Sequence, residues 1–293
     1  IDMYGADAVR FSLTTRTSPG NDMRLNESKL EASRNFVNKL WNAARFVMSN
    51  VENAEGLEDW EYPRALTHRE DRWIISRLNQ VMAQVDDHMK QYQFGEAQRV
   101  LHDFLWSEYC DWYLEMSKVR IRSGDEPSPL PVLAHVLEHV LRLLHPFLPF
   151  ITEEIWQSLR SRLPSTTDAR DALVVASYPQ IDRSRVDADA EREVEAILEL
   201  VRAARNVRAV FRIEKNQTIQ ARVTAASELQ QVFIDASLFI KSGAGIELTV
   251  VNEAGSESGS EEAVHILGSG TMAMAIGGLV DISQETVRLR EEL

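Results

Sequence analysis

The spacing of apolar residues changes once along this chain of 293 residues, and the change limits the folds that the chain can adopt. Up to about residue 210, apolar side chains recur every three to four positions, which is the period of a helix with one buried face. Beyond that point they alternate over 219–225 and 272–276, as in a half-buried strand. The sequence therefore predicts a mainly α protein, in which an antiparallel helical bundle precedes a small α+β domain.

Breaks in the pattern divide the first part of the chain into separate helices. The predicted helices span residues 27–51, 73–89, 96–122 and 132–144. The fourth ends near Pro146 and Pro149, because proline removes a backbone donor and clashes with the preceding turn. Thr152, followed by two acids, is expected to cap a short fifth helix. Helices joined so closely pack side by side in alternating directions, so we expect a bundle at roughly residues 27–163.

The second part of the chain opens with a predicted helix over 187–210 and continues into strands, of which the short apolar run 246–251 is one. The polar residues 253–262 (EAGSESGSEE) predict a mobile loop between two strands. Ser283 is expected to cap a last helix. The expected limits are 27–180 for the bundle with its connection and 181–282 for the small domain.

Charge and cysteine content narrow the classes of function. The chain has 45 acidic and 32 basic residues, so any contact with a polyanion must be made locally by a few placed cations. One cysteine, Cys110, provides neither a disulfide framework nor a thiolate zinc cluster. No apolar run reaches the roughly 18 residues of a membrane span. We expect a cytoplasmic protein without a membrane segment and, since the initiator methionine is missing, a piece of a longer chain.

No arrangement of side chains in the sequence argues for catalysis. The spacing supports no Ser/His/Asp, Cys/His or paired-carboxylate site. His135 and His139 are four residues apart, but the glutamate placement of a zinc-protease helix is missing. We therefore predict no catalytic residue and no metal ligand.

A surface suited to unpaired bases is predicted on the first long helix, opposite its buried stripe. On a wheel of about 100° per residue, this surface carries Asn35, Lys39, Asn42 and Phe46, with Asn38 and Arg45 at its margin. An aromatic ring offers a stacking surface, while amides and cations bind base edges and phosphates. The alternative, equally open at this point, is that another helix covers Phe46.

The predicted helix over 96–122 is rich in aromatic residues, most of which are expected in the core. It also carries Glu108 and Glu115, seven residues apart and nearly in line on the wheel. A carboxylate in this setting either pairs with an arginine or accepts from a base amino group. For Glu108 we expect the arginine.

A basic edge is predicted on the helix that opens the second domain and on the turn after it. It consists of Arg202, Arg205, Arg208, Arg212 and Lys215. These cations either grip phosphates or form a solvated face that pairs with Glu195 and Glu199.

Several blocks of the sequence resemble class I aminoacyl-tRNA synthetases. Residues 4–11 (YGADAVRF) are similar to the segment that follows the ATP-binding KMSKS loop in the enzymes for valine, isoleucine and leucine. The blocks most similar to the valyl-tRNA synthetases are residues 34–46 (RNFVNKLWNAARF), 108–115 (EYCDWYLE) and 144–156 (LHPFLPFITEEIW). Beyond these the resemblance is looser.

The resemblance implies that the bundle is an anticodon-binding domain and that its partner is tRNA(Val). In that family, anticodon contacts come from the positions that match Lys39, Arg45, Phe46, Leu114 and Glu115. Possible further contacts are Asn35, Asn42, Arg205 and Arg208.

The resemblance also implies what this chain lacks. The family's catalytic, editing and zinc-binding parts lie upstream, so we expect no cofactor here and no activity of this chain alone. The parent enzyme would use ATP with Mg²⁺, and its catalytic domain would be a partner within the same protein. Residues 1–26 would end the catalytic and stem-contact region, and residues 283–293 would begin a coiled-coil helix. The alternatives are an isoleucyl or leucyl synthetase fragment and a non-catalytic helical module that binds other proteins.

Overall fold

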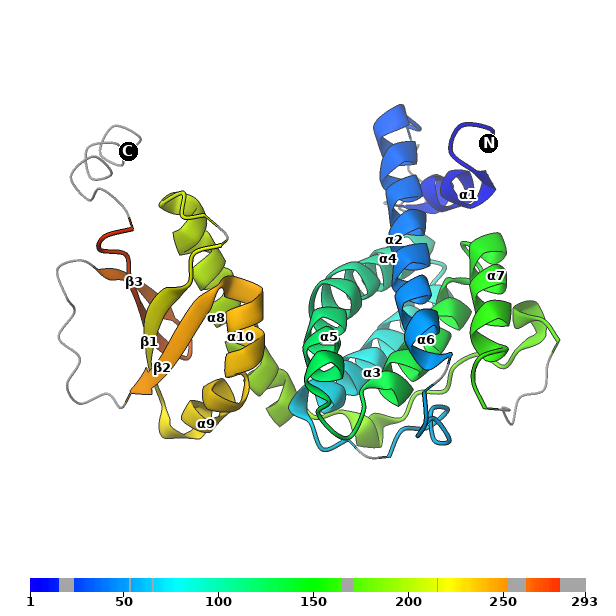
Figure 1. Cartoon of the computed structure of the whole chain (residues 1–293). Coiled ribbons are helices and arrows are strands. Elements are labelled where there is room, and N and C mark those ends of the chain that lie inside the picture. The colour runs from blue at the N-terminus through cyan, green and yellow to red at the C-terminus, as the bar shows by residue number, and fades with distance from the viewer. Residues whose placement is uncertain are drawn as a thin grey trace. The chain divides into compact units, whose positions relative to one another are not determined.

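A computed structural model of the chain describes residues 1–15, 24–52, 54–64, 66–164, 171–214, 216–251 and 262–279. The chain forms two compact units, Ile1–Ala188 and Asp189–Leu293, each with its own core (Figure 1). Within the described residues, no helix combines the length and the apolar character that crossing a membrane requires.

Unit 1 is built of helices. Its α-helices are α1 (Ala6–Thr14), α2 (Glu27–Val51), α3 (Arg69–Lys90), α4 (Phe94–Asp103), α5 (Leu114–Ser123), α6 (Leu130–Leu144) and α7 (Pro149–Arg160). A π-helical stretch, η1 (Phe104–Tyr113), joins α4 to α5, and two short 3₁₀ turns follow α7, η2 (Leu173–Val175) and η3 (Arg183–Arg185). Helix α6 is buried on nearly all sides and packs against α2, α3, α4 and α7.

Helix α2 has the predicted limits, because its capping residue and its buried stripe mark the same stretch of the chain. The side chain of Asn26 caps it by accepting a hydrogen bond from the Lys29 backbone N–H at 3.0 Å. Phe36, Leu40 and Val47 recur at helical spacing and are fully buried. The opposite face is left for polar side chains.

The third predicted helix is continuous but not uniform. Its central ten residues, η1, follow the wider π-helical turn, in which backbone bonds join residues five apart. This turn shifts the faces of the helix relative to a regular α-helix. The wheel drawn for residues 96–122 therefore does not describe which side chains share a face after Phe104.

Helix α7 begins at Pro149, so the predicted cap at Thr152 was wrong. Proline suits the first helical position, where its missing N–H has no partner to lose. Asp7 of α1 supplies the cap by accepting a hydrogen bond from the Ile151 backbone N–H at 2.7 Å. Thr152 is buried in the first turn, and its hydroxyl donates to the Leu148 carbonyl at 2.7 Å. Because Asp7 is so distant in the chain, the sequence around Thr152 gives no sign of this cap.

Unit 2 combines helices with a four-stranded sheet of order β2-β1-β4-β3. Its strands are β1 (Ile219–Ala225), β2 (Ile246–Val251), β3 (Glu262–Leu267) and β4 (Gly270–Ala275), and its helices are α8 (Ala188–Val210), α9 (Ser227–Asp235) and α10 (Ser237–Ala244). β1 is parallel to β2 and antiparallel to β4. The parallel pair is joined through α9 and α10, which pack against β2. The mainly α architecture with a small α+β part is confirmed.

The sequence patterns located β1, β2 and β4 closely but gave no signal for α9 and α10. The division between the units lies after Ala188, later than the expected limit at residue 180. Residues of the connection pack against α3: the Asp182 N–H donates to Asn79 Oδ1 and the Asp187 N–H to Ser76 Oγ, each at 2.8 Å. The predicted loop up to residue 261, Lys215 and the helix at Ser283 lie outside the described residues.

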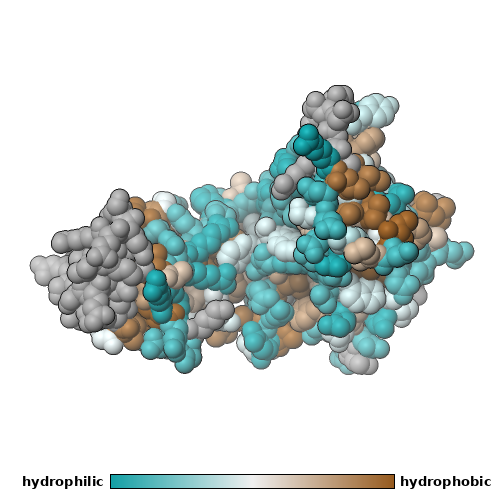
Figure 2. Space-filling view, turned by 90° about the horizontal axis from the view of Figure 1, so that it is seen from above, coloured by the Kyte–Doolittle hydropathy of each residue, from teal (hydrophilic) through white to brown (hydrophobic). Residues whose placement is uncertain are grey.

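A group of exposed apolar side chains on unit 1 bears on where a ligand binds. Exposed apolar side chains include Met3, before α1, and Phe150, at the start of α7. Figure 2 shows apolar residues gathered on the side where Figure 1 has these two helices. Phosphates need cations and hydrogen-bond donors. A nucleic-acid surface is therefore better sought elsewhere on the unit.

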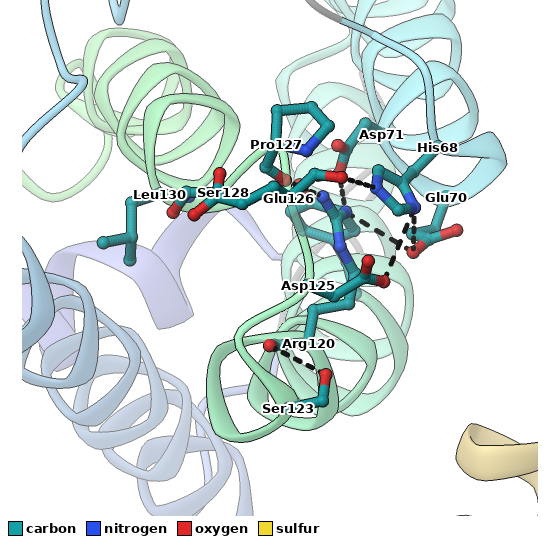
Figure 3. Close-up of polar contacts among 11 residues, drawn as sticks. His68, Glu70, Asp71, Arg120, Ser123, Asp125, Glu126, Pro127, Ser128 and Leu130 are labelled. Atoms are coloured by element: carbon teal, nitrogen blue, oxygen red, sulfur yellow. Dashed lines mark hydrogen bonds and ion pairs between the residues drawn. The ribbon is translucent and has the colours of Figure 1, made fainter.

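The turn between α5 and α6 is fixed by a polar network (Figure 3). Arg120 of α5 contacts Asp71 of α3 and donates to the Pro127 carbonyl. His68, just before α3, lies 3.1 Å from the Glu126 carbonyl. The network holds α3, α5 and the start of α6 together, which keeps the wall of the candidate site in place.

Candidate nucleic-acid interface

A hollow of about 400 Å³ lies between α2 and the η1–α5 helix. Six residues predicted to contact RNA line it: Asn35, Lys39, Asn42 and Phe46 from α2, and Leu114 and Glu115 from α5. Asn38, Ala43, Trp106, Cys110, Asp111 and Lys118 complete the lining. We call this site the polar hollow. Lys39 and Leu114, which are 75 positions apart in the chain, thus share one surface.

The two walls of the polar hollow follow from different helical periods. On α2, positions 35, 38, 39, 42 and 46 recur at α-helical spacing on the face opposite Phe36 and Leu40. On the other wall the π-helical turn brings Trp106 and Asp111, five apart, to the same side. The α-helix that resumes at Leu114 adds Glu115 and Lys118 to that side.

Phe46 was expected either to be exposed for stacking or to be covered by another helix. In the structure it is half-buried, which is intermediate between the two. The ammonium of Lys118, on α5, lies 5.3 Å from its ring centroid. A cation at this distance attracts the π-face of the ring. Part of the ring is therefore covered from α5, and part faces the polar hollow.

Lys39 is not an isolated surface cation. Its Nζ lies 2.5 Å from Asp111 Oδ1 and 4.2 Å from the centroid of the Trp106 ring. Its side chain is 25% exposed. Lys39 thus links α2 to η1 across the polar hollow.

Leu114 and Glu115 differ in how much surface they offer. Leu114 is 5% exposed, so it forms the floor of the polar hollow and presents little area for stacking. The Glu115 side chain is 49% exposed and accepts a hydrogen bond from Lys118 at 2.6 Å. Glu115 is the more accessible of the two, as an acceptor already paired with a cation.

Glu108 pairs with an arginine, as expected. Arg77 of α3 donates to both of its carboxylate oxygens, with Nε–Oε2 at 2.7 Å and Nη2–Oε1 at 3.0 Å. Glu108 therefore contacts α3, whereas Glu115 lines the polar hollow. The shared line that the wheel drew through these two residues did not lead to a shared site.

The remaining predicted contacts do not line the polar hollow. Arg45 of α2 is exposed and lies outside its lining. Arg205 and Arg208 belong to unit 2, where Arg205 Nε donates to the Gly243 carbonyl at 2.8 Å. Arg202, on the same helix, pairs with Glu195 at 2.7 Å, so the alternative of a salt-bridged face holds for that cation.

Arg208 is a structural residue of unit 2, and the prediction that it lies on an accessible basic edge was wrong. It is 8% exposed, and its guanidinium donates to the carbonyls of Gln217 at 2.8 Å and Gly245 at 3.1 Å. It also donates to the Glu214 carbonyl. Because Arg208 is buried and three of its five N–H donors are bound to backbone carbonyls, it offers a phosphate little access.

Sequence reasoning missed Trp106, Asp111 and Lys118 as parts of the site. The first two were hidden by the assumption of a regular α-helix over 96–122, which assigns the aromatics of this stretch to the core.

Cys110 also lines the polar hollow, but its thiol is held neutral. Burial raises the pKa of Cys110 to about 12, because a thiolate loses its hydration there. In the part of the chain that the structure describes, no three His, Cys, Asp or Glu side chains cluster so that they would hold a metal ion. The polar hollow is thus suited to stacking and hydrogen bonding.

The sequence of the chain matches a known protein family. Residues 71–224, just over half of the chain, match the family described as the anticodon-binding domain of tRNA ligase. A valine–tRNA ligase of Dehalococcoides mccartyi strain CBDB1 is 43% identical over 295 residues, which are 100% of this chain and 33% of that protein. The valine–tRNA ligase of Symbiobacterium thermophilum is 40% identical over 314 residues, 100% of this chain and 34% of that protein.

Two further similarities complete the comparison. A valine–tRNA ligase of Bacillus cereus strain ATCC 10987 is 35% identical over 298 residues, 99% of this chain and 32% of that protein. A solved ternary complex of LeuRS, tRNA and LeuAMS from Agrobacterium radiobacter K84 has 17% identity and a TM-score of 0.48, and covers 85% of this chain and 28% of that one. The chain spans about one third of the length of the valine–tRNA ligases that it matches. With the family model matched over more than half of its residues, the chain belongs to the family of tRNA-ligase anticodon-binding domains.

Proposed function

We propose that this chain is the anticodon-recognising part of a valine–tRNA ligase and that the polar hollow of unit 1 binds the anticodon loop of tRNA(Val). The observation that carries the proposal is the meeting of Lys39 and Phe46 of α2 with Glu115 of α5 around one hollow. Valine specificity is supported by the relatives at 40–43% identity, which are valine–tRNA ligases. Those relatives argue against an isoleucyl or leucyl fragment.

Each side chain has a role that its chemistry allows. A loop base stacks on the accessible part of Phe46, and Leu114 forms the floor beneath it. Lys39 and the exposed Arg45 contact phosphates or base edges. Glu115 accepts from a base amino group or orients a cation.

The amides of Asn35 and Asn42 supply both donors and acceptors at the rim of the polar hollow. They are exposed, so they reach base edges without a prior rearrangement. Arg205 remains a possible contact from unit 2.

The activity of the whole enzyme is part of the proposal. It would join valine to tRNA(Val) using ATP with Mg²⁺, releasing AMP and pyrophosphate, in the cytoplasm. Catalysis would belong to an upstream domain of the same protein, and this chain alone would be inactive. Anticodon binding would contribute to the rate by orienting the tRNA acceptor end toward that domain.

The test is binding of the 293-residue chain to anticodon stem-loops of valine and isoleucine tRNA at about 50 and 200 mM salt. We expect tighter binding of the valine loop than of the isoleucine loop, and affinities for both that fall about sevenfold over this range, as for two phosphate contacts to a single strand. Phe46→Ala should weaken binding about 5- to 150-fold, the range for losing one stacked base. Lys39→Ala should flatten the salt dependence.

Matched controls separate these roles from general surface changes. Phe150→Ala removes an exposed ring that does not line the polar hollow, and Lys90→Ala removes a lysine that pairs with Asp86 as Lys39 does with Asp111. Both should bind like the unaltered chain. A preference for the isoleucine loop would indicate that the chain recognises the tRNA of another synthetase. Salt-insensitive binding with no preference would favour a protein-interaction module instead.

A further inference from the structure

Trp106 is the last ring of a stacked column that begins in α1. Phe11 stacks on Phe36 with 4.9 Å between ring centroids, Phe36 on His102 with 4.8 Å, and His102 on Trp106 with 5.6 Å. Phe11 and Phe36 are fully buried, whereas Trp106 is half-buried and lines the polar hollow. The column thus fixes in place an indole that reaches the hollow. A platform already ordered loses little conformational entropy when a ligand stacks on it.

Lys39, paired with Asp111, covers this indole. The Lys39 ammonium lies 4.2 Å from the Trp106 ring centroid and is held there by Asp111 at 2.5 Å. The two side chains are 25% and 48% exposed, so water and ions reach the pair. An ion pair this exposed contributes little to stability. A phosphate can therefore replace the carboxylate as the partner of the ammonium.

We propose that Trp106 and Asp111 form a second base-recognition element of the polar hollow, which opens when a phosphate draws Lys39 away. This inference rests on the proposed function and extends it to two residues outside the predicted site. One base stacks on the Trp106 indole, and its exocyclic amino group donates a hydrogen bond to the carboxylate that Lys39 has released. Phe46 serves another base of the same loop.

The carboxylate determines which bases suit this element. An ionised Asp111 only accepts hydrogen bonds. Adenine, cytosine and guanine each present an exocyclic amino donor, whereas uracil has carbonyl oxygens and only its ring N3–H as a donor. The element therefore selects a base with an amino group over uracil, and stacking on Trp106 adds affinity without distinguishing bases.

Stacking is tested with stem-loops of valine tRNA in which 2-aminopurine replaces each anticodon-loop base in turn, because its fluorescence is quenched when it stacks. We expect the unaltered chain to quench the 2-aminopurine fluorescence at one position that Trp106→Leu leaves unquenched. The affinity of Trp106→Leu for the stem-loop should be about 5- to 150-fold lower than that of the unaltered chain. Trp106→Phe, which keeps a ring, should retain most of the quenching. Trp41→Leu alters a half-buried tryptophan of α2 outside the hollow and should change neither. Circular dichroism checks that each variant is folded.

The hydrogen bond is tested by combining a protein change with a base change at the position found above. Replacing the amino-bearing base with one that lacks the amino group should weaken binding to the unaltered chain about 5- to 150-fold. Asp111→Ala should abolish that preference. Asp189→Ala, which removes an exposed carboxylate hydrogen-bonded to Arg192 at 2.7 Å, should leave it intact.

The outcomes separate this inference from the proposed function. Equal quenching by Trp106→Leu and the unaltered chain, or an amino-group preference that survives Asp111→Ala, would overturn the inference. If Phe46→Ala still weakened binding in that case, the proposed function would stand. If no variant of the polar hollow, including Phe46→Ala, changed binding, both proposals would fall.

Discussion

Arg120 and Asp71 form an ion pair in the interior of unit 1, with 2.7 Å between Nη1 and Oδ1 (Figure 3). Their side chains are 5% and 1% exposed. Asp71 also accepts a hydrogen bond from the Tyr113 hydroxyl at 2.6 Å. The carboxylate of α3 is thus bound by two residues of the η1–α5 helix, the same helix that forms one wall of the polar hollow.

Removing one partner of this pair should be costly. Arg120→Met leaves the Asp71 carboxylate buried without its cation, and we expect unit 1 to lose about 3–5 kcal/mol of unfolding free energy. All six tryptophans lie in unit 1, so urea unfolding followed by tryptophan fluorescence measures this unit alone.

The companion variants show whether the charge is the cause. Asp71→Asn combined with Arg120→Met removes both charges and should be more stable than Arg120→Met alone. Arg122→Met changes an exposed arginine two residues away and should stay within about 0.5 kcal/mol of the unaltered chain. A loss below about 1 kcal/mol for Arg120→Met would contradict the assigned role.

Buried histidines should make unit 1 sensitive to mild acid. His135 and His139 lie on α6 with 4.1 Å between ring centroids, and burial lowers the pKa of both, that of His135 well below 6.5. Because the folded pKa is lower than the unfolded one, the unfolded chain binds protons first as pH falls. The stability contributed by the neutral rings is therefore present above pH 6.5 and lost below it.

The expected loss at pH 5 relative to pH 7.5 is at most about 2 kcal/mol for His135, the limit set by an unfolded pKa of 6.5. His135→Gln should remove that part of the pH dependence, as followed by urea unfolding at both pH values. Val136→Ala, a buried neighbour without a titrating group, should lower stability by the same amount at each pH. If His135→Gln left the pH dependence of stability unchanged, buried His135 would not be its cause.

Local patterns predicted the elements whose signals are local. The limits of α2 follow from the cap at Asn26 and an unbroken amphipathic stripe, and β1 follows from strict alternation. The face of α2 that carries Lys39 and Phe46 was predicted for the same reason, since a regular helix fixes which residues share a side. Half of the polar hollow was therefore predictable from sequence.

The other half depends on features that a helical wheel cannot represent. The π-helical turn of η1 changes the period within a continuous helix, so Trp106 and Asp111 were not placed beside Lys39. The fate of Arg208 was decided by backbone carbonyls of residues up to 37 positions away. Its spacing resembles that of an exposed arginine, and only the fold distinguishes the two.

Arg208 should stabilise unit 2 without affecting RNA binding by the polar hollow. Arg208→Met removes the donor to the Gln217 carbonyl and one of the two donors to the Gly245 carbonyl, which also accepts from the Ile219 N–H, and we expect a loss of about 1–3 kcal/mol. Unit 2 has no tryptophan, so the loss should appear in circular dichroism and not in tryptophan fluorescence. Arg202→Met, which breaks an exposed pair, should cost less than about 1 kcal/mol. Comparable losses for the two variants would argue against the structural role of Arg208.

The single cysteine provides a test of the polar hollow that needs no RNA. Burial raises the pKa of Cys110 to about 12, so at pH 8 only about one thiol in ten thousand is ionised. Since the thiolate is the nucleophile, the rate of alkylation by iodoacetamide should rise about tenfold per pH unit from pH 8 to 10 without levelling off. In urea the same thiol should level off near pH 9, as an ordinary cysteine does. A plateau near pH 9 in the folded protein would mean that water reaches Cys110, and that the floor of the polar hollow is more open than its packing beside Leu114 implies.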